Sequence, residues 1–219
     1  MRRTIHLLLV FTTSIGCGYL SQAMDLGKLR ANYLRLTGSA QEERFTTWSN
    51  TLVTVMPLSE TAKLGKVNAF FNDQLRFSDD QEIWNSSDYW ATPMETLAKG
   101  AGDCEDFAIA KYYSLLYLGV PVERLRLTYV RARINGAGNA IVQAHMVLTY
   151  YPSPEAVPLV LDNLIDSILP ASRRPDLQPV FSFNSQQIYA ASSAASTSTS
   201  RLSRWQDLLH RAHNEGFDK

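Results

Sequence analysis

The apolar residues of this chain change their spacing once, at Gly119-Val120-Pro121. Before that point they recur every three or four residues, as on one face of a helix. After it they alternate with polar residues, as in a strand that is half exposed. The pattern therefore predicts an N-terminal part built from helices and a later part built from strands.

Individual elements follow from the same spacing and from helix caps, breakers and turns. Helices are expected over 26–36, 42–55, 59–75, 94–99, 104–118 and 202–213, and strands over 124–131, 140–151, 159–161 and 181–183. Asn135-Gly136 is a hairpin signal between the two longest strands. Residues 76–93 are rich in Asp, Asn, Ser and Trp and are expected to form a loop. Trp84 and Trp90 in this loop would either join the local core or line a groove.

The first 23 residues have the features of a secretory signal peptide. Two arginines follow Met1, an apolar run occupies 7–11, and Ser21-Gln22-Ala23 provides small residues for cleavage after Ala23. The run is too short and too polar to span a bilayer, so the mature chain is expected to be exported and not to be an integral membrane protein. Two other interpretations stay open, a buried N-terminal helix and a lipoprotein signal that ends at Cys17.

The remaining length suits one domain with a small appendage. We expect a single domain over 24–189, followed over 190–219 by a linker rich in Ala, Ser and Thr and a short helix. Of the 219 residues, 21 are Lys or Arg and 21 are Asp or Glu, so the net charge is zero. This balance gives no indication of a nucleic-acid partner or of an anionic membrane surface.

Cleavage after Ala23 would leave Cys104 as the one cysteine of the mature chain, which rules out an internal disulfide. Cys104 lies in the first turn of a predicted helix, directly after Gly100-Ala101-Gly102. Unpaired N–H groups and the helix dipole favour an anion at that place, so the pKa of the thiol is expected to fall. The position favours a nucleophile over an inert buried cysteine.

A cysteine nucleophile needs a base and a group that orients the base. His145 lies inside an apolar predicted strand, whereas His210 and His213 follow the linker. Asp162 ends the next predicted strand, and it can reach the imidazole if the two strands are antiparallel neighbours. Taken singly, His145 also suits a core position and Asp162 a turn. Together with Cys104 they predict a catalytic triad.

Three carboxylates, those of Asp103, Glu105 and Asp106, flank Cys104. Their negative charge would raise the pKa of the thiol and oppose the effect of the helix start. In one interpretation Asp103 caps the helix and the other two complement its dipole in solvent. In the other, all three surround a divalent cation, for which Ca²⁺ is the natural choice in an exported protein.

The segment 89–112 resembles the core motif of the bacterial transglutaminase-like cysteine proteases, and within that family the periplasmic LapG type. The motif centres on Gly-Asp-Cys-Glu-Asp-Phe at 102–107. The similarity continues through 143–148 and 161–164, in the same order along the chain, and covers about 26–189.

This resemblance implies a papain-like, transglutaminase-like α+β fold with N-terminal helices and an antiparallel sheet. It implies that Cys104, His145 and Asp162 form a Cys-His-Asp triad. It further implies that the enzyme requires Ca²⁺ and that the acids beside the cysteine bind it. The implied metal ligands are Asp103, Glu105 and Asp106.

Proteases of this type cut a large, repeat-rich surface adhesin near its N-terminus, at a pair of small residues such as Ala-Ala. Release of the adhesin promotes biofilm dispersal, and an inner-membrane receptor for cyclic di-GMP holds the protease while that nucleotide is abundant. The resemblance therefore implies a periplasmic, calcium-dependent endopeptidase with these two partners. The alternatives are a transglutaminase-like acyl transferase, which passes the acyl group to an amine, and a non-catalytic module that only docks onto a receptor.

Overall fold

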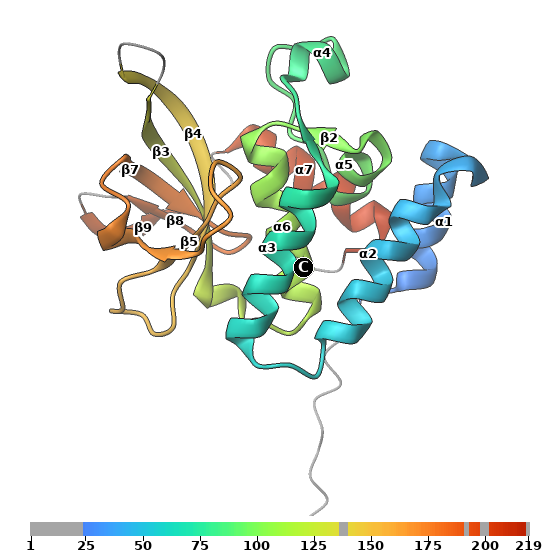
Figure 1. Ribbon diagram of the computed structural model, residues 1–219, viewed down its shortest axis with the longest axis horizontal. Coiled ribbons are helices and arrows are strands. Elements are labelled where there is room, and N and C mark those ends of the chain that lie inside the picture. The colour runs from blue at the N-terminus through green and yellow to red at the C-terminus, as the bar shows by residue number, and fades with distance from the viewer. Residues whose placement is uncertain (1–23, 136–139, 191–192, 198–201, 218–219) are drawn as a thin grey trace, which may run out of the picture.

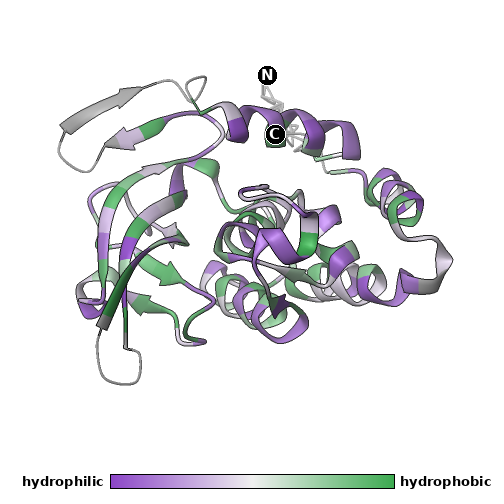
Figure 2. Cartoon of the chain, turned by 90° about the horizontal axis from the view of Figure 1, so that it is seen from above, coloured by the Kyte–Doolittle hydropathy of each residue, from purple (hydrophilic) through white to green (hydrophobic). Residues whose placement is uncertain are grey.

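Two layers, one of helices and one of sheet, make up the fold (Figure 1). The computed structural model describes residues 24–135, 140–190, 193–197 and 202–217. The predicted signal peptide, residues 1–23, lies outside the described residues. Figure 2, seen from above, shows the helices gathered beside the sheet. The fold is α+β, as expected from the resemblance.

Apart from α4, the described helices begin and end close to the predicted positions. They are α1 (Leu26–Thr37), α2 (Glu42–Val55), α3 (Glu60–Gln74), α4 (Asp80–Trp84), α5 (Pro93–Lys99), α6 (Cys104–Tyr117) and α7 (Ser203–Glu215), with 3-10 turns at Ser39–Gln41, Val122–Arg124 and Ala171–Arg173. Side-chain caps explain several of the starts: Asp25 accepts N–H groups of α1, Ser59 caps α3, and Thr92 forms a capping box with Glu95 of α5.

The segment expected to be a loop, 76–93, contains two short elements. These are α4 and the strand β1 (Arg76–Phe77), which pairs in parallel with β2 (Ala101–Gly102). The loop expectation was wrong here because β1 exists only through a partner some 25 residues away, which local composition does not reveal. This small ladder fixes the chain just before α6 begins.

The described strands other than β1 and β2 form one antiparallel sheet in the order β6-β5-β4-β3-β7-β8-β9. The strands are β3 (Leu125–Asn135), β4 (Ala140–Tyr150), β5 (Leu159–Leu161), β6 (Leu169–Pro170), β7 (Leu177–Phe183), β8 (Ile188–Ala190) and β9 (Ser193–Thr197). Strands β3 and β4 pair along their whole length, from Leu125↔Tyr150 to Asn135↔Ala140. The antiparallel sheet confirms that part of the fold prediction.

The main core lies between the helices and one face of the sheet. Strand residues on that face, such as Leu127 and Leu148, are fully buried against the helices. Helix α6 is the central element, and its Ile109, Tyr112 and Leu115 have no exposed surface. A second, smaller cluster covers the opposite face of the sheet; it consists of Val130, Ala132, Val147 and Val160.

The last helix is part of this core. Trp205, Leu208 and Ala212 of α7 are fully buried, and the indole N–H of Trp205 donates to the carbonyl of Asn184 at 3.1 Å. Strand β9 lies within the segment that the composition indicated as a linker. The described residues contain no helix with the length and apolar character needed to cross a membrane.

Candidate active site

Cys104 is the first residue of α6, where the glycines before it place it. Gly100 has φ +62°, a conformation that suits glycine, and it ends α5. A Cβ at Gly102 would lie 2.6 Å from Cβ of Asp106, so the chain can pass this close to α6 only as glycine. The cysteine is thereby held at the junction of the helices and the sheet.

The sulfur of Cys104 lies between strand β4 and its own carboxylate neighbour. The backbone N–H of Met146, the residue after His145, lies beside the sulfur and favours its thiolate form, and the thiol donates to Glu105 Oε2 at 2.9 Å. Burial and the Glu105 carboxylate raise the pKa of the thiol well above its ordinary value. The expected lowering by the helix start is therefore overridden while Glu105 faces the sulfur.

His145 and Asp162 meet across neighbouring antiparallel strands. Leu148 of β4 pairs with Leu161 of β5, which brings Asp162 beside the imidazole. Nε2 of His145 lies 2.8 Å from Oδ1 of Asp162, and both side chains are buried. The ring nitrogen left for another partner is Nδ1.

The carboxylate of Asp162 is held from its other side by Arg174, a residue that the sequence did not single out. Arg174 Nη2 donates to Oδ2 at 2.7 Å, and the backbone N–H of Leu164 donates to Oδ1 at 3.1 Å. Burial alone would raise the pKa of Asp162, but the hydrogen bonds and charges of His145 and Arg174 outweigh it and bring the pKa to about 2. Asp162 is therefore ionised at every pH at which the protein would work.

The helices support Asp162 through its backbone. Lys111 of α6 is fully buried, and its Nζ donates to Asn72 Oδ1 at 2.7 Å and to the carbonyl of Asp162 at 3.1 Å. Asn72 of α3 donates to the same carbonyl at 3.0 Å. Burial lowers the pKa of Lys111 to about 7. Both helices thus fix the end of β5 relative to Cys104.

The three acids beside Cys104 belong to a larger acidic cluster that also contains Asp80 of α4 and Asp88. Its overlapping groups are Asp103 with Cys104 and Glu105; Asp80 with Asp103 and Asp106; and Asp80 with Asp88 and Glu105. Within each group, one ligand atom per residue lies within 4.8 Å of the others. Asp80 and Asp88 could not be assigned to the cluster from the sequence, because their only signal was an acidic segment 15 to 25 residues upstream.

Several oxygens of this cluster are buried without a hydrogen-bond donor. They are Asp80 Oδ1, Asp88 Oδ1, Asp103 Oδ1 and Asp106 Oδ2. Asp103 occupies the cap position of α6, but its side chain makes no capping hydrogen bond, contrary to the capping interpretation. Burial and the neighbouring carboxylates raise the pKa of Asp103 to about 9 and also raise the pKa of Asp106. A buried set of repelling, unpaired oxygens fits a hard divalent cation.

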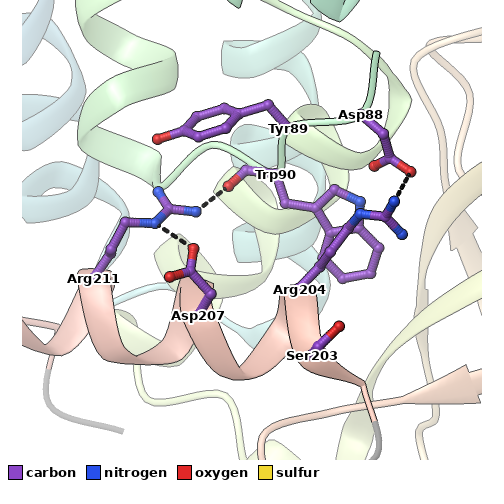
Figure 3. Close-up of a pocket in the computed structure, with 7 residues that line it drawn as sticks. All are labelled: Asp88, Tyr89, Trp90, Ser203, Arg204, Asp207 and Arg211. Carbon is purple, nitrogen blue, oxygen red and sulfur yellow. Dashed lines mark hydrogen bonds and ion pairs between the residues drawn. The ribbon is translucent and has the colours of Figure 1, made fainter. Parts of the chain in front are cut away.

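Helix α7 holds loop residues 88–90, which include Asp88 of this cluster, around a pocket of about 250 Å³ (Figure 3). Arg204 Nη2 lies 2.9 Å from Asp88 Oδ2. Arg211 donates to the carbonyl of Trp90 at 2.6 Å and to Asp207 at 2.8 Å. The helix outside the expected domain thus positions a loop that carries a candidate metal ligand.

The chain is similar to known proteins in both sequence and fold. Residues 32–177, well over half of the chain, match the family described as bacterial transglutaminase-like cysteine proteinase. No curated protein matches the chain.

Among solved structures, LapG from Legionella pneumophila is similar over most of both chains. The EGTA-treated protein is 39% identical with a TM-score of 0.76, over 87% of this chain and 98% of that one. A second structure of the same protein is 38% identical (TM-score 0.75, 87% and 97% covered), and its calcium-bound structure is 40% identical (TM-score 0.73, 85% and 98% covered). The chain belongs to the bacterial transglutaminase-like cysteine proteinases.

Proposed function

We propose that the mature chain is a periplasmic, calcium-dependent endopeptidase with Cys104 as nucleophile, His145 as general base and acid, and Asp162 as the residue that orients the imidazole. The observation that carries this proposal is the 2.8 Å contact between His145 of β4 and Asp162 at the end of β5. The backbone N–H that follows His145 on β4 lies beside the Cys104 sulfur. Family membership supports it.

In the acylation step, Nδ1 of His145 takes the thiol proton and the sulfur attacks the scissile carbonyl. Backbone N–H groups at the start of α6 stabilise the oxyanion. When the intermediate collapses, the imidazolium gives its proton to the leaving amine and a thioester remains on Cys104. His145 then deprotonates a water molecule, which attacks the thioester. The second collapse releases the carboxylic acid, and the proton returns to the thiol.

Asp162 acts through the other ring nitrogen. Ionised and held by Arg174, it accepts the Nε2–H hydrogen bond throughout, which fixes the tautomer with Nδ1 free to accept a proton. It also stabilises the imidazolium that forms in each step. It does not itself become protonated.

Ca²⁺ would be held by Asp103, Glu105 and Asp106, with Asp80 and Asp88 as further ligands from the upstream loop. A bound cation neutralises the carboxylates that raise the pKa of the thiol. The buried oxygens without donors support this assignment. The calcium-bound structure of Legionella pneumophila LapG supports the choice of metal.

The proposed substrate is the N-terminal region of a large, repeat-rich surface adhesin, cut at a pair of small residues such as Ala-Ala. Its release would promote biofilm dispersal. We further propose that an inner-membrane receptor for cyclic di-GMP sequesters the protease. Both partners follow from the family resemblance around Cys104.

The test incubates the mature chain with an N-terminal fragment of such an adhesin from the same genome, in CaCl₂ or in EGTA, beside the Cys104→Ala variant. The proposal expects two shorter fragments with calcium and none with EGTA or the variant. Cutting that survives in Cys104→Ala contradicts the nucleophile, and cutting that survives in EGTA contradicts the calcium requirement. Cross-linked products in place of fragments would identify an acyl transferase.

A further inference from the structure

Strand β4 has an open edge next to the candidate active site. It pairs with β3 over Ala140–Tyr150, but on its other side β5 covers only Leu148–Tyr150. Among the described residues, no strand pairs with the outer side of β4 over 140–147. In Figure 1 this part of β4 extends with β3 beyond the shorter strands of the sheet.

The backbone groups that face this edge follow from the register. In an antiparallel pair, two opposite residues both face each other or both face away. The N–H of Arg133 donates to the carbonyl of Asp176 on the β7 side, so its partner Val142 faces away from β3. By alternation, Ala144 and Met146 face the same way. Val142 and Ala144 therefore present their N–H and C=O groups to the open edge.

The sulfur of Cys104 continues this row of backbone groups. It lies beside the N–H of Met146, which the register makes the next outward-facing donor after Ala144. Two residues of a strand span about 7 Å. When an extended peptide bonds to Val142 and Ala144, the residues that follow along the peptide therefore reach the Cys104 thiol.

A mainly apolar pocket begins at Val142 and Ala144 and extends inward over β3 and β7, on the side of β4 away from its open edge. It has a volume of about 260 Å³ and is lined by Tyr129, Val130, Arg131, Val142, Gln143, Ala144, Val180 and Phe181. Ile141 and Val142 are each 60% exposed and Val180 is 46% exposed. From 140 to 147 the strand carries no Lys, Arg, Asp, Glu or Pro, the residues that commonly protect an edge from pairing.

We propose that the protein substrate binds by strand addition: an extended segment beside the scissile bond pairs with the backbone of Val142 and Ala144 and packs an uncharged, apolar side chain against these two residues, the near wall of the pocket. The inference rests on the proposed function, because it names how the substrate reaches Cys104. The occupant is substrate rather than a second copy of the chain because the edge ends at the sulfur.

Binding to the Cys104→Ala variant tests the inference apart from catalysis. The probe is a fluorescein-labelled 12-residue peptide that spans the bond cut in the adhesin fragment, and a set of analogues carries one N-methyl amide each. Strand addition predicts that methylation weakens binding at least about tenfold at alternate positions on one side of the bond, since every second N–H donates to β4. A flat profile, or one without alternation, overturns the inference.

A pair of variants tests the same edge from the protein. Val142→Pro removes an outward N–H while the ladder to β3 keeps all its donors. It is expected to weaken binding of the adhesin fragment to the Cys104→Ala background at least about tenfold, because the ring also blocks the approach of a strand. Val142→Ala keeps the N–H and is expected to change binding less than about threefold. Equal effects of the two variants contradict backbone pairing.

Two results separate this inference from the proposed function. Alternating binding without any cleavage by the active chain would support strand addition and contradict the protease proposal. Cleavage that Cys104→Ala abolishes, together with fragment binding that Val142→Pro leaves unchanged, would support the protease proposal and contradict strand addition. Dimers of the Cys104→Ala chain that Val142→Pro dissociates, with fragment binding unchanged, would assign the edge to self-association and overturn the inference.

Discussion

Arg174 donates to Oδ2 of Asp162 at 2.7 Å, on the carboxylate oxygen that His145 leaves free. Arg174 also pairs with Asp176, at 2.7 Å, so its guanidinium is fixed by two acids. Since the side chain is only 4% exposed, this ion pair is part of the interior rather than a surface contact. The orientation of His145 thus depends on a residue 29 positions later in the chain.

Arg174→Met should weaken the proposed activity without removing the nucleophile. Asp162 would keep His145 but lose its second partner, so its pKa should rise from about 2. We expect kcat/KM to fall roughly 10- to 100-fold and the acid limb of the pH–rate profile to move to higher pH. Alkylation of Cys104 by iodoacetamide, measured in parallel, should still occur. An unchanged acid limb would show that Arg174 has only a packing role.

The same variant should be less stable in a pH-dependent way. The folded pKa of Asp162 lies below its ordinary value, so the carboxylate contributes stability above about pH 4, and this contribution is lost as pH falls toward 2. Loss of Arg174 removes part of that contribution. Urea unfolding should therefore show a deficit at pH 7 that shrinks at pH 3.

Calcium should stabilise the wild-type chain and not Asp106→Asn. The Asp106 side chain is fully buried, and its Oδ2 has no donor among the described residues. At a calcium concentration 100-fold above Kd, binding adds about 2.7 kcal/mol, which corresponds to a Tm increase of about 5–10 °C. In EGTA the variant should be at least as stable as the wild type, because one repelling charge is gone.

Asp73→Asn is the matched control for that experiment, because Asp73 is exposed on α3 and lies outside the acidic cluster. It should keep the full calcium-dependent rise in Tm. A rise that persists in Asp106→Asn would move the metal away from this cluster. Differential scanning fluorimetry in CaCl₂ and in EGTA gives both values.

Glu215→Gln should raise stability at alkaline pH. Burial raises the pKa of Glu215 to about 8, and the side chain accepts a hydrogen bond from Thr92 at 2.8 Å. The folded state therefore retains a proton that the unfolded state releases above about pH 4.5, so stability falls as pH rises from 4.5 to 8. The amide keeps the acceptor and removes this loss, which for a pKa rise from 4.5 to about 8 is worth on the order of 5 kcal/mol. Tm measured from pH 5 to 9 should show a difference between the two proteins that grows up to about pH 8 and then stays constant.

Trp205→Ala should destabilise the whole domain. The side chain is fully buried and its N–H donates to Asn184. Removal of a buried tryptophan costs about 3–5 kcal/mol. The half-buried Trp84 provides the comparison, since Trp84→Ala should cost clearly less. Urea unfolding midpoints of the two variants compare these losses of stability. Equal losses would mean that α7 is not part of the cooperative core.

Residues whose role is visible in the neighbouring sequence could be predicted from the sequence. Cys104 follows a glycine break, and His145 and Asp162 lie in a strand and at a strand end, so their types and order pointed to one site. The antiparallel pairing of β4 and β5 supplies the contact that this order required. The helices were predicted well for the same reason, because capping and spacing are local properties.

Residues that reach the site only because distant segments of the chain pack together could not be predicted from the sequence. Asp80 and Asp88 look like ordinary loop acids until β1 pairs with β2 and folds that loop onto α6. Arg174 has no local feature that distinguishes it from Arg173. The lowered pKa expected for Cys104 failed because burial and the direction of the Glu105 side chain, which spacing does not define, outweigh the helix start.

The position of α7 has a consequence for when the protein becomes active. Trp205 completes the core and Arg211 holds the loop at Trp90, yet both lie about 100 residues after Cys104 in the chain. A chain that has been synthesised through Asp162 but not through α7 lacks these contacts. The loop that carries Asp88 is therefore held in place only after α7 has been made, which delays assembly of the site until synthesis has passed that helix.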